Sequence, residues 1–205
     1  MFAKTTAIAG VLGTAVAAGY ARTLHRRLHT DPLTGLANRP ALQRVFAGLQ
    51  RRARAGELVG LLLCDLDAFK PVNDTHGHRV GDHLLQSIAA TLTELTSGTR
   101  ELAVRLSGDE FAVLLPGLEE VRGAEARART YRTALAAERL VDGRRLQVTA
   151  SVGAAVDTAR DTTLSALLGH ADWRMYQLKP RSRRTAVPAA PACPTARLRD
   201  HKEAA

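Results

Sequence analysis

The sequence predicts an α+β fold in which helices flank a mostly antiparallel sheet. Apolar residues recur with a period of two in some segments and with a helical period in others. After a first helix, these segments follow one another in the order strand, helix, strand, strand, helix, strand, helix. That order contains the split β-α-β-β-α-β arrangement, in which the helices cover one face of the sheet.

The composition fits one globular domain with extensions at both ends. The chain has 205 residues, of which 45% are hydrophobic, enough to build a sizeable core. The net charge of +9 comes mostly from arginine, but no zinc-ligand spacing, helix-turn-helix motif or aromatic RNA-binding motif accompanies it. Nucleic acid is therefore not an expected partner. Cys64 lies in an apolar strand and Cys193 in a Pro/Ala tail, so no disulfide framework is expected, which fits a reducing cytoplasm.

The two ends of the chain differ from the middle. Residues 5–21 carry no charge and are barely long enough to cross a bilayer. Arginines follow this stretch, so the positive-inside tendency predicts a single-pass inner (cytoplasmic) membrane protein whose folded domain lies in the cytoplasm. A soluble cytoplasmic protein with an N-terminal helix or disordered leader is the alternative. We expect an anchor and linker over 1–29, one domain over 30–184, and a disordered Pro/Ala/Arg tail over 185–205.

The first half of the domain contains two amphipathic helices around a buried strand. The first helix is expected over about 40–55, because apolar residues recur at helical spacing at Leu42, Val45, Phe46 and Leu49. Residues 59–65 form an apolar strand. A polar loop follows it, with Lys70, Asn73, Asp74 and His78. The second helix is marked by Leu84, Leu85, Ile88, Ala89, Leu92 and Leu95.

The second half begins with a β-hairpin over residues 102–115. Apolar residues alternate on both sides of Ser107-Gly108-Asp109, which supplies the turn, and Pro116-Gly117 ends the second strand. A helix over 118–140, a strand over 146–156 and a last helix over 163–178 complete the domain.

Carboxylates gather where two of these strands end. The apolar run 59–64 ends in Asp65-Leu66-Asp67, and the hairpin turn carries Asp109 and Glu110. Adjacent carboxylates against a hydrophobic sheet are costly unless a cation or hydrogen-bond donors compensate. If the strands pair, Asp65 and Asp109 meet at one edge as hard oxygen ligands for Mg²⁺. The pattern predicts metal-assisted phosphoryl or nucleotidyl transfer. Taken singly, each aspartate also suits a loop cap or a turn.

Several ordered motifs resemble those of GGDEF-domain diguanylate cyclases. The motifs are 31–39 (DPLTGLANR), 65–74 (DLDAFKPVND), 105–111 (RLSGDEF), 75–82, 149–153 and 171–176. The resemblance implies a palm-like nucleotidyl cyclase fold. It also implies that two GTP condense into cyclic di-GMP and two pyrophosphates across a two-fold homodimer. The alternative is a catalytically weak or silent GTP-binding or dimerisation module of the same fold.

The resemblance also implies roles for individual residues. Two Mg²⁺ ions, or Mn²⁺ in their place, are held by Asp65, the backbone carbonyl of Leu66 and Asp109. Glu110 binds metal or deprotonates the attacking hydroxyl. Strand alternation places Glu110 opposite to Asp109 unless the turn is irregular. The residues implied to face the triphosphate are Lys70, Lys179 and Arg183, as expected of cations.

The resemblance further implies that Asn73 and Asp82 occupy the positions that recognise guanine, and that His78 contacts the nucleotide. An amide can meet the guanine edge while a carboxylate accepts from its N–H groups, so this pair selects GTP over ATP. The structural alternatives are an Asx turn at Asn73 and a helix N-cap at Asp82.

The chain departs from the family pattern at three places. Ser107 replaces the first glycine, which would cost about 1 kcal/mol or more if the turn needs a positive φ there. Gly98 and Glu101 stand where the product-inhibition motif Arg-x-x-Asp belongs, so we expect no inhibitory site of that kind. Pro180 follows Lys179 and is expected to end the last helix.

Overall fold

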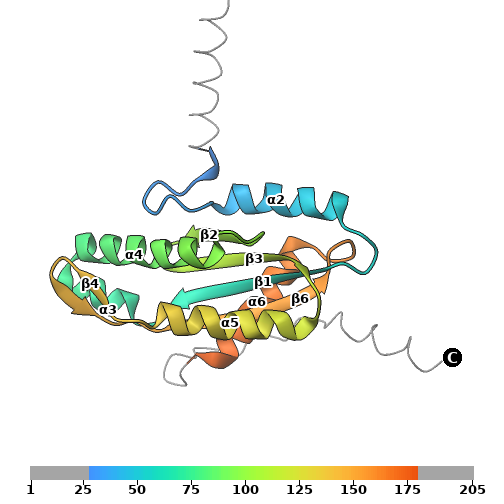
Figure 1. The fold of residues 1–205 in the computed structure, drawn as a ribbon. Helices are drawn as coiled ribbons and strands as arrows, with labels where there is room; N and C mark the ends of the chain where they lie inside the picture. The colour runs from blue at the N-terminus through green and yellow to red at the C-terminus, as the bar shows by residue number, and fades with distance from the viewer. Residues whose placement is uncertain (1–27, 180–205) are drawn as a thin grey trace, which may run out of the picture.

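The computed structural model describes residues 28–179, and one four-stranded antiparallel sheet organises them (Figure 1). The strands of this sheet, in the order β2-β3-β1-β6, are β2 (Leu102–Ser107), β3 (Glu110–Leu118), β1 (Leu58–Leu66) and β6 (Ala150–Thr158). The helices are α2 (Arg39–Arg52), α3 (Phe69–His76), α4 (His78–Thr96), α5 (Val121–Leu135) and α6 (Leu164–Leu178). A separate small hairpin consists of β4 (Arg139–Val141) and β5 (Arg144–Leu146).

Helices cover both faces of the sheet, and alternation along β1 explains why. Leu62, Cys64 and Leu66 belong to a core that includes residues of α4 and α5. Leu61 and Leu63 point to the opposite face, where a second core includes residues of α2 and α6. The helices of the split β-α-β-β-α-β unit thus share one face as predicted, and the helices outside that unit close the other.

Local sequence signals set where two helices begin. The Asn38 side chain accepts a hydrogen bond from the backbone N–H of Ala41 at 3.1 Å and caps α2. The Thr163 hydroxyl accepts from the backbone N–H of Ala166 at 3.1 Å and caps α6. Helix α6 ends at Leu178, before Pro180, as expected.

Gly153 allows α6 to lie directly on the sheet. A Cβ atom at this position would collide with the backbone of α6 at Ala171 and Met175. This close approach leaves the end of α6 near the end of β1, where the ammonium of Lys179 lies 3.1 Å from the carboxylate of Asp65.

The sequence-based prediction was wrong in three local details. The stretch predicted as a polar loop after β1 is mostly the short helix α3, which buries none of its residues. The predicted helix over 118–140 ends at Leu135, and the hairpin β4–β5 follows it. Pro116 and Gly117 lie within β3, where the pairing with β1 shifts register. The Asp142-Gly143 turn of β4–β5, with φ of 48° and 75°, was the overlooked signal.

Within residues 28–179, no helix is long and apolar enough to cross a membrane. The stretch 5–21 and the tail 185–205 both lie outside the described residues. The membrane anchor and the disordered tail stay predictions.

Candidate active site

The pairing of β1 with β3 brings the predicted carboxylates together at one end of the sheet. The Cα atoms of Asp65 and Glu110 are paired across the two strands. The backbone N–H of Leu66 donates to the carbonyl oxygen of Asp109 at 3.3 Å. The β1 arrowhead in Figure 1 marks this end of the sheet. Asp65, Leu66, Asp109 and Glu110 therefore share one edge.

Charges around Asp109 suit a bound cation. Partial burial raises the pKa of Asp109, and the neighbouring Asp65 charge raises it further, while Lys179 and Arg105 oppose the shift. The Lys179 ammonium lies 3.1 Å from Oδ1 of Asp65, so a positive group already faces this carboxylate. Two carboxylates that repel each other beside a backbone carbonyl form an oxygen donor set that fits Mg²⁺.

The protein supplies only part of a metal coordination sphere here. In the described part of the chain, no group of three or more His, Cys, Asp or Glu side chains is placed to hold a metal ion. Mg²⁺ commonly takes one or two carboxylates and completes its octahedron with water and substrate phosphates. The donors present thus match a metal that arrives with a triphosphate.

The second aspartate of the Asp65-Leu66-Asp67 run has a structural role. The Asp67 carboxylate accepts hydrogen bonds from the hydroxyls of Thr149 at 2.6 Å and Ser151 at 3.0 Å. These bonds tie the end of β1 to the start of β6. Asp67 is therefore committed to holding the sheet edge together.

The hairpin turn is irregular, and Gly108 accommodates it. The β2–β3 register shifts between Arg105 and Ser107, and Gly108 has a φ of 50°. Ser107 has no positive φ, so the cost that we considered for a serine at this position does not arise. Its hydroxyl instead donates to the Glu110 carboxylate at 3.1 Å.

Replacing Ser107 with glycine is expected to lower the free energy of unfolding by about 0.5–1 kcal/mol, because glycine loses the hydroxyl bond and adds unfolded-state entropy. Thermal unfolding of both proteins measures this difference. A more stable glycine variant would show that the serine strains the turn.

Arg105 holds the same turn from the side. Its Nε and one terminal nitrogen donate to the carbonyl oxygen of Gly108 at 3.0 and 2.8 Å, and the other terminal nitrogen donates to Oδ1 of Asp31 at 2.9 Å. Thr34 donates to the same Asp31 oxygen through its backbone N–H at 2.9 Å and its hydroxyl at 2.6 Å. Burial opposes ionisation of Asp31, but these hydrogen bonds outweigh it and hold its pKa below the ordinary value.

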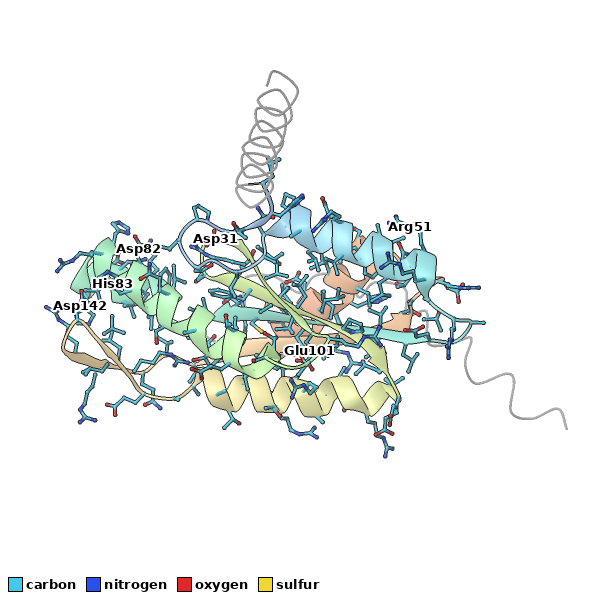
Figure 2. The ribbon with its side chains drawn as sticks, turned by 45° about the horizontal axis from the view of Figure 1, so that its top comes forward. Asp31, Arg51, Asp82, His83, Glu101 and Asp142 are labelled. Carbon is cyan, nitrogen blue, oxygen red and sulfur yellow. The ribbon has the colours of Figure 1, made fainter. Side chains whose placement is uncertain are left out.

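The hydrogen bonds of Arg105 join the start of the domain, where Asp31 is labelled in Figure 2, to the turn that carries Asp109. Sequence reasoning assigned no function to Arg105 or Asp31. The available signal was Asp31-x-x-Thr34, a spacing at which an aspartate accepts hydrogen bonds from its own turn.

The predicted guanine-reading residues come from α3 and α4. Asn73 lies in α3, and Oδ1 of Asn73 is buried without a hydrogen-bond partner among the described residues. His78 is the first residue of α4, and Asp82 lies in its second turn; both side chains are exposed. Asn73 thus forms no Asx turn with its free oxygen, and the N-cap of α4 is Gly77 rather than Asp82.

Gly81 makes room for Asn73. A Cβ at Gly81 would collide with Oδ1 of Asn73. A buried, unpaired amide oxygen costs free energy unless a ligand donates to it. The buried Oδ1 of Asn73 is therefore suited to accept a hydrogen bond from a ligand.

Gly81→Ala is expected to raise the KM for GTP by about tenfold, because the added methyl displaces Asn73 and removes about one substrate hydrogen bond. Initial rates over a range of GTP concentrations measure this change. Gly48→Ala in α2 is the matched control, since its Cβ would meet only one side-chain atom, at 3.9 Å. An unchanged KM would remove Asn73 from the nucleotide site.

The three cations predicted to face the triphosphate differ in where they lie. Lys70 is exposed in α3, and Lys179 is half-buried beside Asp65. Arg183 lies outside the described residues. The structure brings Lys179 to the carboxylates and leaves Lys70 facing solvent.

The hairpin β4–β5 contacts the first turns of α4, where Asp82 lies. Oδ1 of Asp142 lies 2.7 Å from Nδ1 of His83, and its Oδ2 lies 3.9 Å from Arg79. Figure 2 shows Asp142 and His83 next to Asp82. Sequence reasoning missed this contact because it missed the hairpin.

Glu101, which stands at one position of the missing product-inhibition motif, forms hydrogen bonds with two side chains of α5. Glu101 accepts two hydrogen bonds from Arg127, at 2.7 and 2.6 Å, and one from the Tyr131 hydroxyl at 2.6 Å. Burial and the Glu101 charge both raise the pKa of Tyr131, so the phenol stays protonated and donates. Glu101 therefore pins α5 to the start of β2.

Comparisons with known proteins agree with this geometry. The family model described as "Diguanylate cyclase, GGDEF domain" matches residues 28–185. The chain belongs to the GGDEF domain family. The GGDEF cyclase fold, an antiparallel four-stranded sheet flanked by helices, is also found in solved relatives. A sensory box/GGDEF family protein from Caulobacter crescentus is 36% identical, with a TM-score of 0.66, over 73% of this chain and 97% of that one.

Two further relatives are similar to this chain. Diguanylate cyclase DgcN of Escherichia coli is 38% identical over 164 residues, which cover 78% of this chain and 38% of DgcN. The GGDEF domain of TpbB from Pseudomonas aeruginosa is 34% identical, with a TM-score of 0.67, over 74% of this chain and 88% of that structure. This chain spans less than half the length of the first curated relatives that it matches.

Proposed function

We propose that this protein is a diguanylate cyclase that condenses two GTP molecules into cyclic di-GMP. The observation that carries the proposal is the meeting of Asp65 and Asp109 beside the Leu66 backbone at one sheet edge, with Lys179 next to them. Family membership and relatives named as diguanylate cyclases support it. Each 3′-oxygen attacks the α-phosphorus of the other GTP, so two P–O bonds form and two pyrophosphates leave.

Two divalent ions, Mg²⁺ or Mn²⁺, would be held by the carboxylates of Asp65 and Asp109 and by the Leu66 carbonyl. Bound there, the ions would neutralise the triphosphate and lower the barrier to attack on the α-phosphate. Glu110, whose Cα atom pairs with that of Asp65 across the strands, would accept the proton of a 3′-hydroxyl or contact an ion. Ser107 orients the Glu110 carboxylate through its hydroxyl.

The substrate is oriented by residues on both sides of these carboxylates. Asn73 and Asp82 would accept from the N–H groups of guanine, which adenine presents differently, and His78 would contact the same nucleotide. Lys70, Lys179 and Arg183 would face the phosphates. When GTP arrives, the Lys179 ammonium that now pairs with Asp65 would exchange this carboxylate for a phosphate oxygen.

Turnover needs two copies of this site, because one site presents one GTP and the product contains two guanosines. We infer that a homodimer forms with the two sheet edges facing each other. We also propose that this cyclase lacks feedback through an Arg-x-x-Asp site, because Gly98 and Glu101 stand at the positions of that motif and Glu101 already accepts hydrogen bonds from Arg127 and Tyr131.

A silent GTP-binding module is the alternative. Ser107 was its main support, and that support weakens because Gly108 carries the positive φ of the turn. Asn73 and Asp82 oppose a third possibility, an ATP-using cyclase.

The test incubates the full chain with GTP and Mg²⁺, over protein concentrations that span dimer formation, and identifies the products by mass. Cyclic di-GMP and pyrophosphate in a ratio of one to two, formed at a rate per subunit that rises with protein concentration, are expected. ATP under the same conditions is the control. GTP that binds but stays unchanged at every concentration would favour the silent module.

A further inference from the structure

Five exposed arginines line one groove at the end of the sheet that lies far from the hairpin turn Ser107-Gly108-Asp109, which we call the signature turn. Its arginines are Arg44, Arg51, Arg52, Arg54 and Arg100. The groove has a volume of about 1210 Å³ and lies where β1 begins and β3 ends. In Figure 2, Arg51 lies at the opposite end of the molecule from Asp82 and Asp142. GTP at the carboxylates would not reach it.

These arginines lack carboxylate partners within residues 28–179. The ion pairs of the described chain involve other cations. Glu57 is the single acidic residue among the described groove residues, and its Oε2 accepts from the backbone N–H of Arg54 at 2.9 Å. Guanidinium groups that repel one another around a groove are stabilised by an anionic ligand.

The floor of the groove is apolar. Val45 and Leu49 of α2, with Pro116 and Leu118 of β3, line it and are half-buried. A ligand that matches the whole groove therefore combines negative charges, which pair with the exposed arginines, with aliphatic groups, which cover the half-buried apolar residues. Interfaces of this kind have an apolar centre and a charged rim.

Two other anionic ligands fit less well. Grooves that bind single-stranded nucleic acid stack its bases on aromatic side chains, and no aromatic residue is among the described residues that line this groove. A planar membrane surface would meet the rim arginines without filling the apolar floor between them. The amphipathic character of the groove favours a peptide segment.

The complementary segment does not come from this chain. Residues 1–27 contain no aspartate or glutamate, and residues 180–205 contain only Asp200 and Glu203 among seven basic or histidine residues. Elsewhere the longest runs of acidic residues are the pairs Asp109-Glu110 and Glu119-Glu120. Neither the two ends of the given sequence nor a second copy of it therefore offers an acidic segment.

We propose that this arginine groove docks an acidic segment with aliphatic residues, contributed by a different protein. The inference is independent of the proposed cyclase activity. Electrostatic attraction by the arginines accelerates encounter with such a partner, and the apolar floor selects segments that also carry leucine or valine. Binding at this end leaves the opposite edge, with Asp65 and Asp109, open to GTP.

The test uses the full chain and a fluorescein-labelled 14-residue peptide of glutamate pairs alternating with leucines, followed by fluorescence anisotropy at low salt. The double variant Arg44→Ser with Arg51→Ser is expected to weaken binding about tenfold, the loss of two charge contacts. The double variant Arg129→Ser with Arg132→Ser removes the same charge from exposed positions on α5 and should change binding less than about twofold.

A second peptide, in which serines replace the leucines, tests the apolar floor and should bind about tenfold more weakly. Equal binding of the two peptides, or equal effects of the two double variants, would show that the peptide binds through the net charge of the protein alone. Either result would overturn the proposal. Vesicles with anionic lipid provide the comparison with a membrane surface. Stronger dependence on Arg44 and Arg51 for vesicles than for the leucine peptide would also overturn it. Circular dichroism of each variant confirms that it is folded.

Discussion

Asp109→Asn is expected to reduce the rate of cyclic di-GMP formation by about 100- to 1,000-fold, the usual loss when one group that stabilises a transition state is removed. An amide keeps the size and one oxygen of Asp109 but loses the charge that attracts a divalent ion. The effect should appear in kcat more than in the affinity for guanine, because Asn73 and Asp82 lie on other elements.

The same substitution is expected to stabilise the metal-free protein. Burial and Asp65 raise the pKa of Asp109, so the folded state binds the proton more tightly than the unfolded chain does. The free energy of unfolding of the native protein therefore falls as pH rises from the unfolded pKa through the raised folded pKa. Asp109→Asn removes that loss, so its free energy of unfolding should exceed that of the native protein at neutral pH.

Chemical denaturation in EDTA at several pH values measures the stability, and product formation with Mg²⁺ measures the activity. Asp67→Asn is the matched control, because it changes a carboxylate of the same segment that holds Thr149 and Ser151. It should lower stability by about 1–2 kcal/mol. A destabilised Asp109→Asn variant that keeps full activity would show that Asp109 is a structural residue.

The carboxylate edge could be predicted from the sequence because its signals are local. Asp65 ends a buried strand, and Asp109 lies at the turn of a hairpin with alternating apolar residues. The directions of these strands determine where both aspartates lie once the strands pair. The antiparallel register then brings the two ends together. The helices α2, α4 and α6 were predictable for a similar reason, because their apolar residues recur at helical spacing.

The supports of the site could not be predicted in this way. Helix α3 buries no residue fully and packs only Phe69 and Val72 against the core, so its apolar stripe is too short to reveal it. Ala68, its N-cap, has a φ of 62° that alanine rarely adopts. Contacts such as Asp142 with His83 join residues far apart in the chain. Their partners depend on tertiary packing, which periodicity does not encode.

Arg105→Gln is the second change with a large expected effect. The Arg105 side chain is 11% exposed and that of Asp31 is 19% exposed, so glutamine would leave a mostly buried carboxylate without its cation. It would also remove both bonds to the Gly108 carbonyl. We expect a loss of about 2–4 kcal/mol in the free energy of unfolding.

Activity should fall beyond this loss of stability. Arg105 fixes Gly108, and Gly108 sets the direction of Asp109, so a turn that drifts by about 1 Å is expected to lower kcat by up to about 100-fold. Arg105→Lys should rescue little, because lysine cannot donate to Gly108 and Asp31 in one planar arrangement.

Arg127→Gln separates positioning from stability. Arg127 also makes two bonds to one carboxylate, that of Glu101, but it lies on α5 and has no contact with the signature turn. Both variants should melt at lower temperature, and well below those temperatures only Arg105→Gln should lose kcat. If the two variants kept equal activity while folded, the link from Asp31 through Arg105 to Gly108 would serve stability alone. If only Arg105→Gln were slow, the start of the domain would control the geometry of the metal carboxylate, because Asp31 and Gly108 share one guanidinium.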